Sequence, residues 1–143
     1  MKIVVDTNIV FSAILNINGK IGELLFNPFF DFYTCDFLKQ ELNEHHEKLK
    51  KISKLSEEQL KISKTLIFSK LKFVNSILLE ESILLSTEEI MIDIDPDDIE
   101  FIALGRQLNA KVWTGDKKMH NKLLEKGFDF TLLTEELWAF IVK

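Results

Sequence analysis

Short apolar segments alternate with longer amphipathic segments along the whole chain. The short segments are rich in β-branched and aromatic side chains and predict strands; they cover residues 3–5, 32–35, 73–75, 112–114 and 128–132. The longer segments carry apolar residues at the spacing of a helix. Strands that alternate with helices predict a parallel sheet covered by helices on both faces. We therefore expect an α/β fold, in a single domain over residues 1–143.

In the first half of the chain, polar residues that favour helix caps set the expected helix boundaries. Asn8 is expected to cap a helix that runs to about Leu15. Asp36 is expected to cap one longer, continuous helix that runs to about Lys51. A short helix is expected between these two, over residues 20–26, because an Asn-Pro pair follows it and stops it.

In the second half, two stronger signals mark helix starts. Ser56 and Gln59 form a capping box for a helix whose apolar stripe reaches Leu71. Asp95 is expected as the N-cap of a further helix, with Pro96 at its first position. The remaining helices are expected over residues 80–91, as one or two short turns, over 117–126, and over 134–141 after a cap at Thr134.

The composition is that of a soluble globular protein, with 46% hydrophobic and 29% charged residues. No apolar run approaches the ~18 residues that span a bilayer. The N-terminus reaches an acid at Asp6 too early for a secretory signal, so we expect a cytoplasmic protein without a membrane partner. The single cysteine, Cys35, excludes an internal disulfide and a cysteine-based zinc site, and we expect it to be a small buried side chain.

Charge is distributed unevenly along the chain. The formal net charge of −5 argues against a protein that coats nucleic acid through bulk charge. Residues 48–72 nevertheless contain eight lysines and two glutamates, whereas residues 80–100 contain nine acids and no base. A lysine-rich hairpin is more often a solvated surface, and the alternative is an arm that follows RNA beside an acidic site.

Four acidic residues stand near points where a strand or loop passes into a helix; they are Asp6, Glu41, Asp98 and Asp116. The carboxyl ends of parallel strands meet at one edge of a sheet, so these side chains are expected to converge there. Each acid alone has an ordinary explanation as a helix cap, an Asx turn or a partner of the helix dipole. Glu41 fits such explanations least, because it lies on the flank of a buried helix face, where an unpaired carboxylate is unfavourable.

Converging carboxylates require a compensating charge. Two unit charges ~4 Å apart repel by about 4 kcal/mol at an effective dielectric constant near 20. A divalent hard cation offsets this repulsion. The chain offers oxygen ligands and has no cysteine set or histidine pair suited to zinc, which favours Mg²⁺ or Mn²⁺. A cation held by carboxylates is suited to activate a water and to stabilise in-line displacement at a phosphodiester.

The segments that carry these acids resemble the four acidic motifs of the PIN-domain nucleases. The matching segments are residues 4–8, Glu41 on the helix after the second strand, residues 98–104 and residues 112–116. The resemblance extends in order and spacing over essentially the whole chain. It implies a three-layer α/β/α sandwich with a central parallel sheet of four to five strands. It also implies Mg²⁺- or Mn²⁺-dependent cleavage of RNA, with Asp6, Glu41, Asp98 and Asp116 as the catalytic and metal-binding acids.

The resemblance also implies roles for neighbouring residues and for partners. Thr7 or Asn8, together with Thr114, are expected to brace the acids, and Asp97 competes with Asp98 for the third acidic position. Small stand-alone members of the family include toxins of bacterial or archaeal toxin–antitoxin pairs. RNA and a cognate antitoxin are therefore expected partners, and an exposed share of the phenylalanines is a candidate surface for the antitoxin or for a homodimer.

Other basic residues near the expected site have two interpretations. Lys117 and Lys118 follow Asp116 directly, and they either steer a phosphate or are plain solvated lysines. His45 lies four residues after Glu41 on the same helix face, but hydrolysis by carboxylate-bound metal needs no histidine.

Two other functions remain open from the sequence. A catalytically inert PIN-fold binding module would act through protein or RNA contact and would bind neither Mg²⁺ nor Mn²⁺. A phosphoacceptor domain of the response-regulator type also carries aspartates on a parallel sheet. It is disfavoured because its acidic pair should stand together at the end of the first strand, whereas here Asp6 follows Val5 alone.

Overall fold

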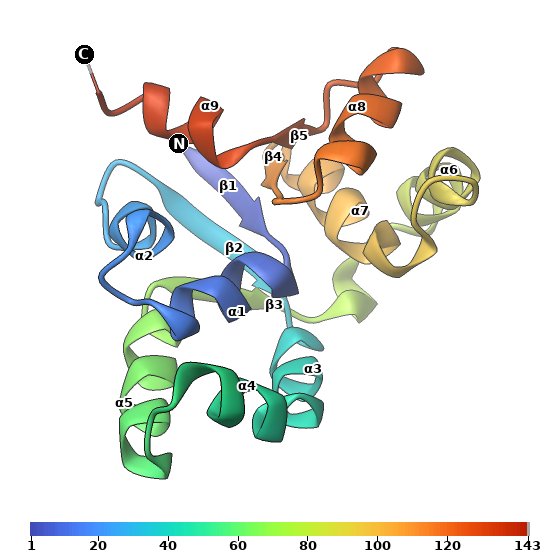
Figure 1. Cartoon of the computed structure of the whole chain (residues 1–143). Coiled ribbons are helices and arrows are strands. Elements are labelled where there is room, and N and C mark those ends of the chain that lie inside the picture. Colours follow the sequence, from blue (N-terminus) through green and yellow to red (C-terminus); the bar gives the residue numbers. More distant parts are fainter. Residues whose placement is uncertain (143) are drawn as a thin grey trace.

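The computed structural model describes residues 1–142 and has a parallel sheet between layers of helices (Figure 1). The strands are β1 Lys2–Val5, β2 Asp31–Cys35, β3 Leu71–Val74, β4 Lys111–Trp113 and β5 Thr131–Leu132. All neighbouring strands pair in parallel, in the spatial order β3-β2-β1-β4-β5. The α/β sandwich with a parallel sheet of four to five strands, predicted from the sequence, is therefore confirmed.

Within residues 1–142, nine α-helices surround the sheet. They are α1 Thr7–Leu15, α2 Lys20–Leu25, α3 Leu38–Glu44, α4 His46–Ser53, α5 Glu57–Phe68, α6 Glu81–Met91, α7 Ile99–Leu108, α8 Lys117–Glu125 and α9 Thr134–Ala139. Helix α7 lies against β1, β2 and β4, and α6 packs on α7. Helix α1 contacts α2, α3, α4 and α5 in the other layer (Figure 1). No helix of the described part of the chain has the length and apolarity to cross a membrane.

The strand register places the predicted site residues at one edge of the sheet. Val5, the last residue of β1, stands opposite Trp113, the last residue of β4. Asp6 and Thr114 follow these two residues directly, so they leave adjacent strands side by side. The hydroxyl of Thr34 in β2 donates a hydrogen bond of 2.8 Å to the carbonyl oxygen of Val5, which ties the third strand end to the same edge.

The core explains why these strands hold their positions. The β1 residues Ile3, Val4 and Val5 are buried, as expected for a strand covered on both faces. Trp113 is also buried, and so is Cys35, as predicted. Burial of such apolar surface contributes roughly 25 cal/mol per Å², so the central strands are fixed more firmly than any surface loop.

The end of α7 packs tightly against the turn that leads into β4, because Gly105 carries no side chain. A Cβ atom at Gly105 would lie 2.7 Å from the carbonyl oxygen of Ala110 and 3.0 Å from a methyl carbon of Val112. A real Cβ atom does not fit at the first of these distances. The glycine therefore allows the turn after α7 to fold back tightly against the end of the helix.

The expected continuous helix from Asp36 to Lys51 is wrong. The chain instead forms α3 and α4, which are separated at His45, where φ is −103° and ψ is 16°. No glycine or proline marks this break. Leu42 and Leu49 are both buried, and α3 and α4 both contact α1, so the segments on the two sides of the break pack on the same helix. Tertiary packing overrides the local helical pattern here.

Several other helix boundaries also differ from the prediction. Helix α1 is capped by Asp6 rather than Asn8, and α3 has no side-chain cap from Asp36. Residues 81–91 form one continuous helix instead of short turns. Leu71 begins β3 rather than ending a helix, and Thr134 is the first residue of α9 rather than its cap.

The two strong helix-start signals are confirmed. The backbone N–H of Gln59 donates to Ser56 Oγ at 3.1 Å, and the N–H of Ser56 donates to Gln59 Oε1 at 2.9 Å. Asp95 caps the turn that begins at Pro96, although residues 96–98 form a 3₁₀ turn before α7 starts at Ile99.

Candidate active site

Asp6 is the most deeply buried acid of the site. It follows β1 directly, and its side chain is 3% exposed. Its Oδ1 atom accepts a hydrogen bond of 2.9 Å from the backbone N–H of Ile9, which caps α1. The cap fixes the direction of one carboxylate oxygen.

Thr114 joins Asp6 to the acid that follows β4. Its buried hydroxyl accepts a hydrogen bond of 3.1 Å from the backbone N–H of Asp116 and is also hydrogen-bonded to Asp6. Asp116 in turn caps α8, because its Oδ1 atom accepts from the N–H of Met119 at 3.0 Å. Thr114 thus contacts both acids that follow the strand ends.

Glu41 reaches the site from α3. Leu38 and Leu42 bury one face of this helix, which turns Glu41 toward α1. The hydroxyl of Thr7, the first residue of α1, donates a hydrogen bond of 2.7 Å to Glu41 Oε1. Of the two braces expected near Asp6, Thr7 is the one that contacts an acid, while Asn8 lines the neighbouring pocket.

The third segment brings more than one acid to the site. Oxygen atoms of Asp95, Asp98 and Asp116 lie within 4.8 Å of one another. Asp95 Oδ1 also accepts a hydrogen bond of 3.0 Å from the backbone N–H of Asp97, whose own side chain is exposed. The sequence pattern predicts only a helix cap at Asp95. Its spacing of three residues from Asp98, on the same turn, is the signal that points to a place in the site.

The pKa values of the site acids report their mutual repulsion. Burial, together with the negative charges of Asp116 and Glu41, raises the pKa of Asp6 to about 6, although the hydrogen bonds from Ile9 and Thr114 act in the opposite direction. Burial also raises the pKa of Asp98 well above its usual range, with added contributions from the charges of Asp6 and Asp95. Acids from all four predicted segments therefore act on one another electrostatically.

This donor set fits a divalent hard cation. The converging groups are carboxylate oxygens, which Mg²⁺ and Mn²⁺ prefer over the nitrogen and sulfur ligands of zinc sites. A cation bound among Asp95, Asp98 and Asp116 would offset the repulsion that raises the pKa of Asp98. The two helix caps and the two threonine hydroxyls hold the acids in place without neutralising them.

A pocket of ≈ 280 Å³ opens beside the acids, between α1, the α3–α4 break and the start of α7. It is lined by Thr7, Asn8, Phe11, Glu41, His45, Lys48, Asp95, Asp97, Asp98 and Phe101. A larger hollow of ≈ 760 Å³ lies between α4 and α5, and none of the four predicted acids lines it. The smaller pocket is therefore the one that adjoins the predicted acids.

A second group of potential metal ligands is already engaged in ion pairs and hydrogen bonds with neighbouring side chains. Atoms of His46, Glu47 and Glu57 lie within 4.8 Å of one another. The Nε2 atom of His46 is 2.9 Å from a carboxylate oxygen of Glu57, and the ammonium of Lys64 lies 3.0 Å from Nδ1 of the same ring. Both ring nitrogens are engaged, so this group is a surface network that joins α4 to α5.

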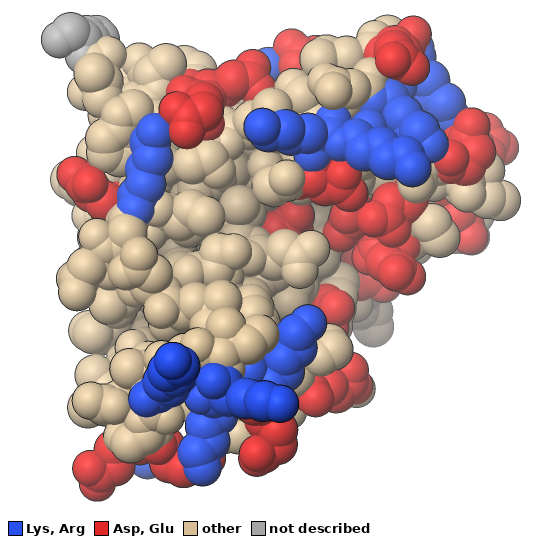
Figure 2. All heavy atoms as spheres, in the orientation of Figure 1, with Lys and Arg blue, Asp and Glu red and all other residues tan. Residues whose placement is uncertain are grey.

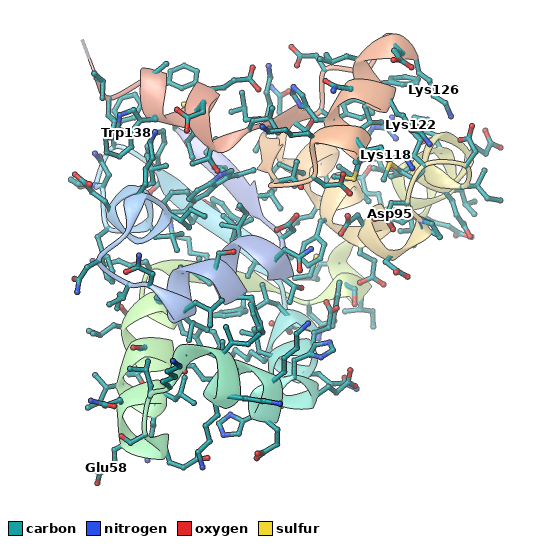
Figure 3. The ribbon with its side chains drawn as sticks, in the orientation of Figure 1. Glu58, Asp95, Lys118, Lys122, Lys126 and Trp138 are labelled. Atoms are coloured by element: carbon teal, nitrogen blue, oxygen red, sulfur yellow. The ribbon has the colours of Figure 1, made fainter. Side chains whose placement is uncertain are left out.

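Basic side chains flank the acids on two sides. Figure 2 shows lysines gathered over α8 and, separately, over α4 and α5, with acidic side chains on the surface between them. Lys117 and Lys118 are exposed at the start of α8 and do not line the pocket. Lys118, Lys122 and Lys126 follow one another along α8 (Figure 3), and Lys126 is paired with Asp93.

Comparisons with known proteins agree with this architecture. A family model described as "PIN domain" matches residues 4–128. Among solved structures, PAE2754 from Pyrobaculum aerophilum aligns with a TM-score of 0.67 and 11% identity, over 99% of this chain and 89% of that chain. VapBC2 from Rickettsia felis, solved bound to a DNA fragment from their promoter, aligns with a TM-score of 0.59 and 18% identity, over 93% of this chain and 97% of that chain. At these identities the structural likeness shows the fold alone. No curated protein sequence matches this chain.

Proposed function

The chain belongs to the PIN-domain family, and from this premise we propose that it is a metal-dependent endoribonuclease that hydrolyses RNA phosphodiester bonds. One observation carries the proposal: acids from four separate segments converge where the strands end, and burial and mutual repulsion raise the pKa of Asp6 and Asp98. A structural role does not require like charges to be held together in this way. A cation site does.

In this proposal Asp95, Asp98 and Asp116 hold Mg²⁺ or Mn²⁺, and Asp6 and Glu41 complete the acidic site. When bound, the ion supplies positive charge for the attacking water and for the leaving oxygen of the phosphodiester. The residues of the chain supply position. The Thr7 hydroxyl orients Glu41, and the backbone N–H groups that Asp6 and Asp116 cap orient those two acids, so the carboxylates are already arranged before substrate arrives.

When no cation is bound, the raised pKa values keep carboxyl groups of the site protonated. With raised pKa values, Asp98 and part of the Asp6 population hold a proton near pH 7. Loading of a divalent cation releases these protons, because the cation stabilises the ionised carboxylates. Metal binding is therefore expected to weaken as the pH falls.

We further propose that the protein acts in the cytoplasm as the toxin of a toxin–antitoxin pair. Support comes from the alignment with VapBC2 over nearly the full length of both chains. Exposed apolar side chains offer a surface for a cognate antitoxin or for a second copy of the chain. Ile77 is 84% exposed before α6, and Leu85 and Ile92 are exposed on and after this helix.

The proposal is tested by incubating the purified protein with structured and unstructured RNAs in Mn²⁺, in Mg²⁺ and in excess EDTA. Cleavage that requires the ions, and that is lost in Asp98→Asn and Asp116→Asn with unchanged circular dichroism, is the expected result. Full activity in EDTA or in these variants would refute the proposal. Calorimetry with both ions separates the nuclease from an inert binding module, which would bind neither.

A further inference from the structure

Two exposed apolar faces of the molecule carry opposite charge. One lies on α5, within residues 48–72, which contain eight lysines and two glutamates. The other lies on α6, within residues 80–100, which contain nine acids and no base. Because exposed apolar surface rimmed by charge is typical of protein–protein contacts, each face is a candidate contact surface.

The basic face lies on the solvent-facing side of α5 and consists of Lys61, Ile62, Leu66 and Lys70. Ile62 is 60% exposed, and Leu66, which follows it by one helical turn, is also exposed. The opposite side of α5 contacts α1, so these two apolar side chains are not part of the core. Lys61 and Lys70 stand before and after them and take part in no ion pair among residues 1–142.

The acidic face lies on the solvent-facing side of α6 and consists of Glu81, Leu85, Glu88 and Ile92. These exposed residues follow one another at steps of four, three and four, which places them on one side of the helix. Helix α6 packs against α7 through its other side. Neither glutamate takes part in an ion pair within the described part of the chain. The charges of both faces are therefore not compensated by side chains of the same molecule.

A hollow of ≈ 440 Å³ opens beside the acidic face. Its lining combines apolar side chains with carboxylates and includes Phe37, Leu84, Ile99, Glu88, Asp97 and Glu100. A lysine side chain has the same division, because its stem favours apolar surroundings and its ammonium favours charge or water. The hollow therefore fits a lysine of a basic segment that docks on this face.

One molecule cannot bring its own two faces together. Helices α5 and α6 stand far apart, at opposite sides of the view in Figure 1. The faces nevertheless match each other, because each combines exposed aliphatic side chains with charges that the other lacks. Two copies repel through their formal net charge of −5, so a contact between copies requires such local complementarity.

We propose that a second copy of this chain docks its basic face on the acidic face, with a lysine side chain of α5 in the hollow beside α6. The contact joins two different surfaces and is heterologous, so each copy contacts two neighbours and the copies form a ring or a longer assembly. The proposal goes beyond the proposed function, because it commits the exposed surface of α6 to a second copy whether or not the protein cleaves RNA. The hollow shares Asp97 with the pocket beside the acidic site, so the docked lysine lies near that site of the neighbouring copy.

Self-association is measured by sedimentation equilibrium on the purified protein, after bound nucleic acid has been removed, over about a hundredfold range of concentration. The runs are repeated at low and at high salt, because salt screens contacts between charged surfaces. Lys61→Gln with Ile62→Gln removes one charge and one apolar side chain from the basic face. Leu85→Gln with Glu88→Gln does the same on the acidic face. Glutamine is a good helix former, so both helices are expected to persist.

Matched controls on α8 make the same kinds of change outside both faces. Lys117→Gln with Leu124→Gln is the control for the basic face, and Leu124→Gln with Glu125→Gln is the control for the acidic face. All three residues are exposed. Circular dichroism and thermal melting check the fold. If a double variant does not fold, the single changes Lys61→Gln and Glu88→Gln at exposed positions keep the test decisive.

We expect wild type to associate reversibly, and more weakly at high salt. Each face variant should weaken the association about tenfold or more, whereas the controls should change it less than twofold. An equal mixture of the two face variants should recover a one-to-one complex that does not grow further, because one variant keeps the acidic face and the other keeps the basic face. A monomeric wild type over the whole range, wild-type association in either face variant, or no complex in the mixture would each overturn the proposal.

The outcome is independent of whether the protein cleaves RNA. Association with the expected losses, but no cleavage in Mn²⁺ or Mg²⁺, would remove the nuclease and keep the contact between copies. Ion-dependent cleavage by a protein that stays monomeric would keep the nuclease and remove the contact.

Discussion

The hydroxyl of Thr7 donates a hydrogen bond of 2.7 Å to Oε1 of Glu41, which lies 34 residues later in the chain. This bond joins the first residue of α1 to the middle of α3 at the rim of the acidic site. Thr7 also follows the buried Asp6 directly, so one short segment contributes an acid and the group that orients another. The hydrogen bond therefore fixes the Glu41 carboxylate of α3 relative to β1 and α1.

Thr7→Val should lower RNA cleavage about tenfold and leave the fold intact. Valine keeps the shape of threonine but cannot donate to Glu41, whose carboxylate then loses a bond to its fixed position. Thr7→Ser restores the hydroxyl and should recover most of the activity. Initial cleavage rates in Mn²⁺ test this, and equal rates for Thr7→Val and wild type would show that Glu41 needs no such brace.

Asp95→Asn should weaken Mn²⁺ binding about tenfold or more in calorimetry. Asparagine retains the oxygen that caps the turn at Pro96, so the change removes charge without removing the cap. Asp93→Asn is the matched control, because Asp93 is an exposed acid nearby whose carboxylate is paired with Lys126 outside the site. If both variants bind Mn²⁺ like wild type, Asp95 is a helix cap and nothing more.

The sheet and the edge where the acids meet were predictable from local signals. β-Branched runs mark the strands, and parallel pairing sends every strand end to the same edge, so Asp6 and Asp116 were placed without any knowledge of packing. Thr114 was also predictable, because it stands between the end of β4 and Asp116. These inferences need only the order of elements along the chain.

Features that depend on packing between distant segments were not predictable in the same way. The break at His45 carries no glycine or proline, and the two helices that flank it both pack on α1. The local pattern identifies Asp95 as a cap, which it is, but its carboxylate also joins Asp98 and Asp116.

Lys117→Gln combined with Lys118→Gln should weaken RNA binding and make it less sensitive to salt. These exposed lysines begin α8 directly after Asp116, so they are placed to meet phosphates that leave the acidic site. Removal of one lysine–phosphate interaction reduces the slope of log K against log salt by about 0.7 for a single strand. Lys111→Gln is the control, since Lys111 begins β4 at the opposite edge of the sheet. An unchanged slope in the double variant would show that neither lysine contacts a phosphate of the RNA.

Without metal, the protein should lose stability as the pH rises, and Asp6 should account for much of the loss. The pKa of Asp6 rises from 3.8 to about 6 on folding, so the folded state binds the proton more tightly than the unfolded state. The resulting stabilisation is complete below about pH 4, is lost as the pH rises through 6, and amounts to about 3 kcal/mol. Asp98 changes in the same direction at higher pH, because its pKa is raised further. Asp6→Asn keeps the cap on α1 and has no proton to lose, so in EDTA its stability relative to wild type should increase by about this amount as the pH rises from 4 to 8, as measured by urea denaturation. Mn²⁺ should restore the stability of wild type at pH 8 but not that of the variant. A difference between variant and wild type that does not vary with pH would mean that Asp6 is not held in a protonated state by its surroundings.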